Sequence, residues 1–193
     1  MENSIHKKIK RRICSYAPGS VFVPSDFSDM ATQSTASKSL CRLCDEGFLR
    51  HVMQGVFWYP NEGAYPSPDK VAHAVARSKA WRIMPCGKTA LYVLGLESER
   101  PKKWTYVTNG TYRRYSYGGY HIEFNNTVSR FMGALSDSSA LLVQVLKAYG
   151  KEKISEDLLK RIKSYFADAE ATVLEEIHDT TEWISDAVVK MFS

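Results

Sequence analysis

The sequence predicts an α+β protein: an N-terminal winged helix-turn-helix followed by a mixed α/β domain that ends in a helical segment. Three observations support this fold class. The first 60 residues read as helix, short strand, two helices and a hairpin; the middle holds several β-prone runs; and from Ser129 onward the apolar period is helical. We therefore expect a winged helix-turn-helix domain at residues 1–60 and an α+β domain at residues 67–193.

The composition is that of a globular chain with a hydrophobic core. The sequence has 193 residues, of which 44% are hydrophobic. No apolar run approaches the roughly 18 residues that a membrane span needs, and residues 1–7 lack the apolar centre of a signal peptide. The four cysteines lack the spacing of disulfide-rich domains. We therefore expect a cytoplasmic protein without a membrane partner.

The net charge of +5 is unevenly distributed along the chain. Residues 1–60 carry eight Lys/Arg and five Asp/Glu, residues 61–120 carry ten and four, and residues 121–193 carry eight and twelve. A basic front suits nucleic acid, whereas the acidic end could meet a basic protein surface. For the acidic end, simple solvation of exposed helical faces is favoured over a partner.

Residues 5–16 predict the first helix, because Ile5, Ile9, Ile13 and Tyr16 recur at helical spacing among basic residues. Pro18-Gly19 ends it. The run Val21 to Val23 predicts a short strand. A second short helix begins at Pro24.

A recognition helix is predicted after Thr32, which can cap its N-terminus. Ala36, Leu40, Leu43 and Cys44 share one side and face a core. The other side is rich in hydroxyl and basic groups, which suit phosphates and base edges. The residues that we expect to read the major groove are Gln33, Ser34, Thr35, Ser37, Lys38 and Arg42.

A hairpin with the dimensions of a wing follows this helix. Two β-prone runs, 48–52 and 56–59, are joined by a turn that contains Gly55. Arg50, His51 and Gln54 would contact phosphate or the minor groove. Spacing alone leaves open a packed helix and hairpin that never meet DNA.

The turn-rich run 60–66 predicts the domain boundary. The elements expected after it are a helix that Ser67 caps, a strand at 81–85, a helix at 88–94, strands at 104–108, 113–117 and 120–124, and then helices only. The last two strands form a hairpin because Gly118-Gly119 separates them. Gly150 ends one C-terminal helix, Ser155 caps the next, and residues 174–191 form a final helical stretch.

No motif in the sequence predicts catalysis. Gly87-Lys88-Thr89 resembles the end of a phosphate-binding loop, but Arg82 occupies the position of the first glycine and Pro85 removes a backbone donor. Gly87 instead permits a tight turn between strand and helix. Cys41 and Cys44 lack a second pair of ligands at zinc spacing. We therefore expect no cofactor, no metal and no enzyme activity.

One further surface is a candidate for binding in the second domain. Basic and aromatic side chains alternate there, and they could hold phosphates or stack on bases, or could contact a protein. Tyrosines that only pack a small sheet are the favoured alternative. The residues are Arg113, Arg114, Tyr115 and Tyr117.

The order of several short motifs resembles AbiEi-like proteins over roughly residues 1–165. These motifs are Pro24-Ser25-Asp26-Phe27, Leu40-Cys41-Arg42-Leu43, Gly47-Phe48-Leu49-Arg50, Gly55-Val56-Phe57-Trp58-Tyr59-Pro60, Pro85-Cys86-Gly87, Leu94-Gly95-Leu96 and Thr108-Asn109-Gly110. The chain departs from the family at Cys86, where a small hydroxyl residue is expected, and in its last helix.

The resemblance implies an antitoxin of a bacterial type IV toxin-antitoxin system, associated with phage defence. Such a protein represses its own operon through operator DNA and counters a nucleotidyltransferase toxin through its C-terminal domain. The alternative is a stand-alone winged-helix regulator whose second domain senses a ligand or forms a homodimer. An enzyme acting on nucleic acid is a third hypothesis, but the sequence offers it neither a metal site nor an acid-base pair.

Overall fold

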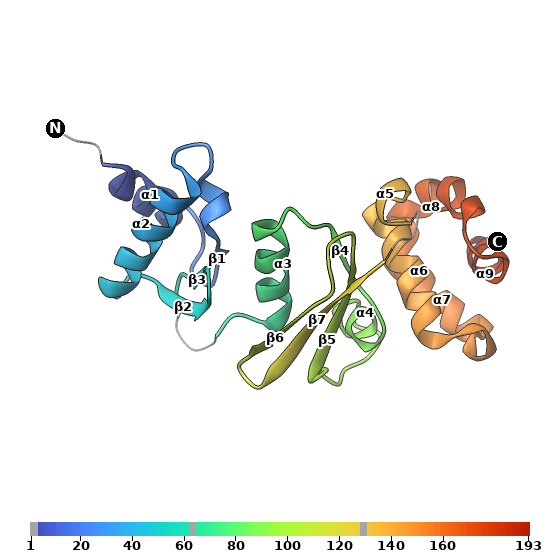
Figure 1. The fold of residues 1–193 in the computed structure, drawn as a ribbon. Helices are drawn as coiled ribbons and strands as arrows, with labels where there is room; N and C mark the ends of the chain where they lie inside the picture. The colour runs from blue at the N-terminus through green and yellow to red at the C-terminus, as the bar shows by residue number, and fades with distance from the viewer. Residues whose placement is uncertain (1–3, 62–64, 128–130) are drawn as a thin grey trace. The chain divides into compact units, whose positions relative to one another are not determined.

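The computed structural model describes residues 4–61, 65–127 and 131–193. The chain forms two compact units, Met1–Trp81 and Arg82–Ser193 (Figure 1). The fold class is the predicted one: N-terminal helices with a three-stranded sheet, then a mixed four-stranded sheet, then C-terminal helices.

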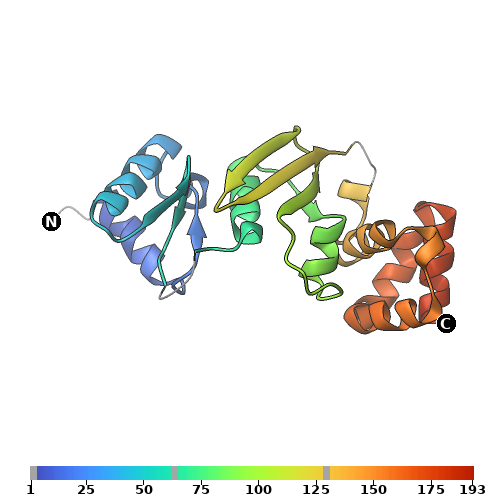
Figure 2. The same cartoon turned by 90° about the horizontal axis from the view of Figure 1, so that it is seen from below.

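Unit 1 is a winged helix-turn-helix with one additional helix. Its elements are α1 (Ile5–Cys14), β1 (Val21–Phe22), the 3₁₀ helix η1 (Pro24–Phe27), α2 (Gln33–Asp45), β2 (Arg50–Met53), β3 (Val56–Trp58) and α3 (Pro68–Ser78). The strands are antiparallel in the order β1-β3-β2. α2 contacts both α1 and η1, and in Figure 2 the blue and cyan helices lie beside the small sheet. The predicted second short helix is therefore a single 3₁₀ turn.

The core of unit 1 uses most of the apolar side chains that the sequence predicts. Ala36, Leu40 and Leu43 are fully buried. They pack with Ile9, Ile13, Phe22, Phe27, Leu49 and Phe57.

Two members of the predicted stripe of the first helix are exposed instead. Ile5 is 37% exposed because it begins α1, and its side chain does not join the core cluster. Tyr16 is 51% exposed because α1 ends at Cys14, so that helical spacing no longer sets its direction. Its ring contacts only the edge of the core, at 5.3 Å from Phe22 between centroids.

A helix follows the predicted turn-rich boundary at residues 60–66. Residues 62–64 lie outside the described part of the chain. Ser67 caps α3 as predicted, since its hydroxyl accepts from the Lys70 backbone N–H. α3 contacts η1, β1 and β3 and belongs to unit 1, although the sequence analysis grouped this helix with the second domain.

Unit 2 begins with a mixed sheet. Its elements are β4 (Ile83–Pro85), α4 (Lys88–Val93), β5 (Lys103–Thr108), β6 (Arg113–Tyr117) and β7 (Tyr120–Asn126). The strand order is β4-β5-β7-β6; β5 and β7 are parallel and the other neighbours antiparallel. Gly118 and Gly119 both have positive φ, which confirms the predicted tight hairpin turn. Gly87 (φ 55°) makes the predicted turn between β4 and α4.

The rest of unit 2 is helical: α5 (Phe131–Ala134), α6 (Asp137–Tyr149), η2 (Lys151–Lys153), α7 (Glu156–Phe166), η3 (Ala167–Ala169), α8 (Glu170–Glu176), η4 (Ile177–Asp179) and α9 (Glu182–Phe192). The helical period from Ser129 starts outside the described residues. Gly150 and Ser155 end and cap their helices as predicted. The prediction of a single helical stretch over residues 174–191 was wrong. Thr180 is extended and separates α8 and η4 from α9.

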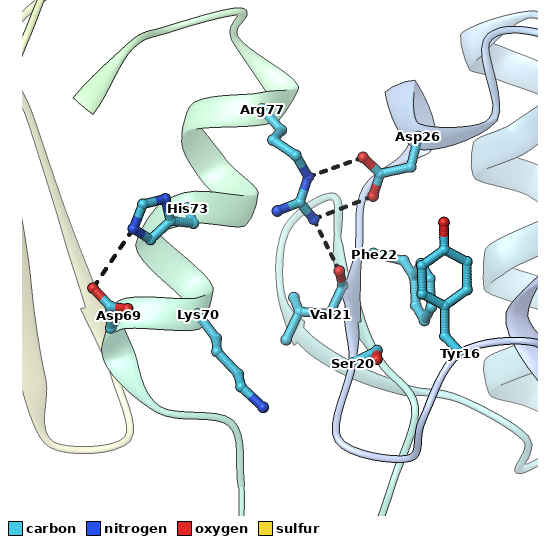
Figure 3. Close-up of a pocket in the computed structure, with 9 residues that line it drawn as sticks. All are labelled: Tyr16, Ser20, Val21, Phe22, Asp26, Asp69, Lys70, His73 and Arg77. Atoms are coloured by element: carbon cyan, nitrogen blue, oxygen red, sulfur yellow. Dashed lines mark hydrogen bonds and ion pairs between the residues drawn. The ribbon is translucent and has the colours of Figure 1, made fainter. Parts of the chain in front are cut away.

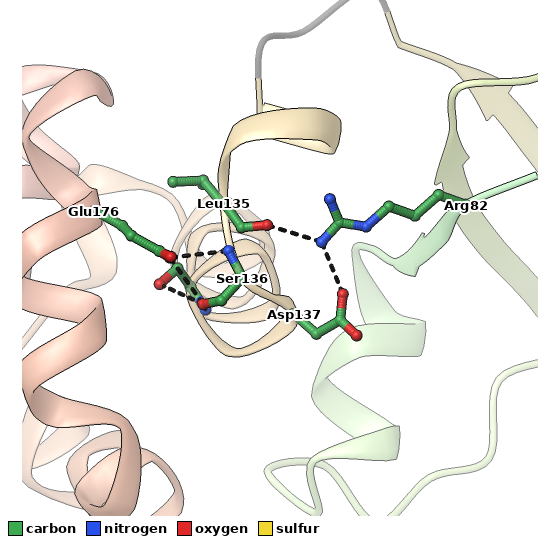
Figure 4. Close-up of polar contacts among 6 residues, drawn as sticks. Arg82, Leu135, Ser136, Asp137 and Glu176 are labelled. Atoms are coloured by element: carbon green, nitrogen blue, oxygen red, sulfur yellow. Dashed lines mark hydrogen bonds and ion pairs between the residues drawn. The ribbon is translucent and has the colours of Figure 1, made fainter.

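Side chains at the start of α6 connect the sheet to the helices within unit 2 (Figure 4). Arg82 donates from one Nη to the Leu135 carbonyl and to the Asp137 carboxylate, both at 2.8 Å. Glu176 accepts from the Ser136 backbone N–H at 2.9 Å and from its hydroxyl at 2.8 Å. The N-terminus of α6 is thus fixed by Arg82, which directly precedes β4, and by Glu176 of α8.

Candidate nucleic-acid interface

The predicted recognition helix is α2, and its polar side faces outward. Thr32 caps the helix, because its hydroxyl accepts from the Thr35 backbone N–H. The exposed members of the predicted set are Gln33, Ser34, Lys38 and Arg42. Thr35 and Ser37 are only half-buried, not exposed, and the Thr35 hydroxyl lies 2.9 Å from that of Thr32. Four of the six predicted side chains are therefore exposed to solvent.

The two cations of α2 form no ion pair with any described residue. The nearest acids in sequence are Asp45 and Glu46 at the C-terminal end of the helix, where Arg42 also lies in the last turn. Glu46 contacts Lys10 at 2.9 Å and His6 at 3.0 Å. The hydrogen bond from Lys10 is the main reason that the pKa of Glu46 lies below its ordinary value. Lys38 and Arg42 thus keep their charge and donors for a partner.

Two basic side chains of α1, unlike those of α2, form ion pairs. Arg12 donates to both carboxylate oxygens of Asp29, at 2.7 and 2.6 Å, which lowers the pKa of Asp29. Lys10 is held by Glu46. Two of the cations that the sequence places on α1 therefore pair within unit 1. Lys7, Lys8 and Arg11 remain exposed.

The wing is the hairpin of β2 and β3, closed by a two-residue turn at Gln54-Gly55. Gly55 has φ +73°, which the turn requires. Arg50, His51 and Gln54 are exposed, as predicted. The Arg50 guanidinium lies 5.9 Å from the Trp58 ring centroid, and the His51 ring lies 4.7 Å from that of Phe57. Both side chains therefore lie against buried aromatic rings of β3 while they remain exposed to solvent.

A contact that the sequence did not predict joins α3 to η1 and β1 within unit 1 (Figure 3). Arg77 donates to Asp26 at 3.0 Å and to the Val21 carbonyl at 2.9 Å. These residues line one side of a pocket of about 580 Å³ that also includes Lys70 and Tyr16. Asp26 and Arg77 are 51 residues apart, so no local pattern indicates their pairing.

The predicted surface of the second domain is divided between the two faces of the sheet. Arg113 and Arg114 are exposed, Tyr115 is half-buried and Tyr117 is buried. Side chains alternate along β6, so Arg114 lies opposite the other three. Tyr115 packs edge-on against Phe124 at 5.9 Å. The tyrosines therefore pack the sheet, as the alternative interpretation held, while the arginines reach solvent.

Thr89 and Cys44, from the phosphate-loop-like run and the cysteine pair, are withdrawn from solvent. Within the described ranges, no group of three or more His, Cys, Asp or Glu side chains could hold a metal ion. Thr89, of the phosphate-loop-like run, is buried and accepts from the Thr105 backbone N–H at 2.8 Å. Burial raises the pKa of Cys44 to about 11.

No helix among the described residues is long and apolar enough to cross a bilayer.

One protein-family model matches this chain. A search of curated proteins found no relative of this chain. The family model described as a family of unknown function, DUF6088, matches residues 8–174, which include α2, the wing and the whole mixed sheet. The chain is therefore a member of the DUF6088 family.

Proposed function

We propose that the chain is a DNA-binding repressor of its own operon and the antitoxin of a type IV toxin-antitoxin pair. The observation that supports DNA binding is the exposed side of α2, where Lys38 and Arg42 form no ion pair with any described residue. Unpaired cations on an exposed helix of a winged helix-turn-helix suit the phosphates and base edges of a major groove.

The wing supports the same proposal. Arg50, His51 and Gln54 follow α2 directly and are exposed on a short hairpin. A cation held above an aromatic ring loses little side-chain freedom when it contacts a phosphate, because the ring already restricts it. In this proposal α2 reads the bases of double-stranded operator DNA and the wing fixes the register on the backbone.

The antitoxin part of the proposal rests on the resemblance to AbiEi-like proteins and on the order of the motifs that carry it. In this account unit 2 counters a nucleotidyltransferase toxin encoded beside it, and the protein has no catalytic role of its own.

DNA binding is tested with DNA from upstream of the protein's own gene, in a gel-shift titration of the full chain. Lys38→Ala and Arg42→Ala are each expected to weaken binding by about tenfold, since each removes a charge-assisted contact. Lys160→Ala is the matched control, because Lys160 is an exposed helical lysine of unit 2. Equal affinity of all four proteins would refute the assignment of α2.

The antitoxin activity is tested by co-expression with the adjacent gene, scored by growth and by co-purification. Rescue of growth that survives Lys38→Ala is expected, because DNA binding and toxin neutralisation are assigned to different units. A neighbour that is not a nucleotidyltransferase, or whose toxicity this chain does not relieve, would favour the stand-alone regulator instead.

A further inference from the structure

Hydrogen-bond donors gather on one face of the sheet in unit 2, where β5, β7 and β6 lie side by side. Lys103 is in register with His121, and His121 with Ser116. One pleat along, Glu123 is in register with Arg114. Residues in register lie about 5 Å apart on the same face, so these side chains form one cluster, which we call the sheet cluster.

A buried carboxylate organises the sheet cluster. The Glu123 side chain is only 9% exposed, and it contacts Lys103 Nζ at 3.0 Å and Arg114 Nε at 2.6 Å. Burial acts to raise the pKa of Glu123, but the hydrogen bonds and charges of the two cations outweigh burial and lower it. The carboxylate is therefore ionised near neutral pH and holds both cations in place.

Arg114 and His121 keep hydrogen-bonding groups that no described residue uses. Only Nε of Arg114 bonds to Glu123, and its Nη groups donate to no other residue in the described ranges. His121 Nδ1 lies 3.4 Å from the Ser116 hydroxyl, which leaves its Nε2 as a further donor or acceptor. Two cations and an imidazole face one carboxylate, so the sheet cluster has an excess of positive charge and of donors.

A pocket of about 320 Å³ lies at the sheet cluster, lined by these five residues and Tyr115. This volume is near the lower end of small-molecule sites, where pockets of roughly 300–1,000 Å³ are typical. Beside it, the Arg114 guanidinium lies 5.5 Å from the Tyr112 ring centroid, and Tyr112 is 48% exposed. An exposed ring next to a cation can stack on a nucleobase.

We propose that the sheet cluster binds the phosphate of a nucleotide, with the base stacked on Tyr112. Arginine and lysine donors suit phosphate oxygens. The phosphate can come from a free nucleotide or from the end of a single-stranded nucleic acid. This site is separate from the DNA-reading residues of unit 1 and does not depend on them.

The test is calorimetric titration of the full chain at low ionic strength with ATP, with adenosine, and with a short 5′-phosphorylated single-stranded RNA. We expect saturable binding of ATP, of the RNA, or of both, and none of adenosine. Arg114→Met and His121→Ala should each weaken the binding by about tenfold, the cost of one charge-assisted contact. No ion pair joins His121 to Glu123 among the described residues, so this variant leaves the ion pairs of Glu123 with Lys103 and Arg114 in place.

Arg113→Met is the matched control, because Arg113 is an exposed arginine on the same strand but on the opposite face of the sheet. Its affinity should equal that of the unchanged protein. Binding of ATP alone would identify a free nucleotide as the source of the phosphate, and binding of RNA alone a nucleic-acid end. Absence of saturable binding to both, binding of adenosine as tight as that of ATP, or equal weakening by Arg113→Met would overturn the proposal.

Discussion

At the scale of single residues, several side chains owe their state to contacts that lie far away in the sequence. Glu176 accepts from the start of α6, 40 residues earlier, and Glu123 holds two cations from neighbouring strands. Acidic residues are concentrated in the last third of the sequence, and this pattern predicted a solvated helical face. For Glu176 that prediction was wrong, because α8 packs against α6 and brings the carboxylate to its N-terminus.

Glu176→Gln is expected to lower the free energy of unfolding by about 1 kcal/mol at pH 7, since it weakens the hydrogen bonds at α6. Hydrogen bonds from the side chain of Ser139 and from Ser136 hold the pKa of Glu176 below its ordinary value of 4.5. This stabilisation is therefore present above pH 4.5 and is lost as the pH falls through the lowered pKa. Urea unfolding at pH 7 and at pH 3 measures both effects.

Glu175→Gln is the control, because Glu175 is the exposed neighbour on the same helix. The difference between the two variants should be present at pH 7 and small at pH 3. Equal stabilities at pH 7, or a difference that does not change with pH, would contradict the role of Glu176.

The cysteines should differ in reactivity. Burial, with a contribution from the charge of Glu123, raises the pKa of Cys86 to about 11, whereas Cys14 is exposed. Two pKa units reduce the reactive thiolate by about a hundredfold. Alkylation followed by mass spectrometry should therefore label Cys14 early and Cys86 late, and unfolding should remove the difference. Early labelling of Cys86 in the folded protein would contradict its burial beside the carboxylate.

At the scale of elements, local signals predicted most helices and strands. Capping residues such as Thr32, Ser67 and Ser155 marked true helix starts, and the Gly118-Gly119 turn marked the hairpin. These signals are local, because a cap or a turn depends on only a few successive residues. Strand pairing is not local. Nothing in the sequence indicated that β5 would pair in parallel with β7, and without that pairing the sheet cluster could not be foreseen.

The position of α3 was missed for the same reason, and its anchoring can be tested. Arg77→Met should destabilise the protein by about 1 kcal/mol, because Arg77 bonds Asp26 and a β1 carbonyl. The control is Lys79→Met, a neighbouring exposed cation without an ion pair to any described residue. Thermal unfolding compares the two variants. A smaller loss in Arg77→Met than in Lys79→Met would show that the contact does not hold α3 in solution.

At the scale of the whole molecule, charge is divided along the chain. The first 120 residues are basic and the last 73 acidic. The basic part includes the exposed cations of α2 and the two cations of the sheet cluster, Lys103 and Arg114, for which we propose nucleic-acid and nucleotide partners. The sequence predicted the fold class and named seven side chains of α2 and the wing that are exposed. It could not show which cations pair internally, as Lys10 and Arg12 do, because their acids come from other elements.

The central claim is that Lys38 and Arg42 contact DNA, and the salt dependence of affinity tests it most directly. Each phosphate contact contributes close to one unit to the slope of log affinity against log salt. For binding of the full chain to its upstream DNA, the Lys38→Ala/Arg42→Ala variant should therefore show a slope shallower by up to about two units. The same slope and affinity as in the unchanged protein would contradict the claim.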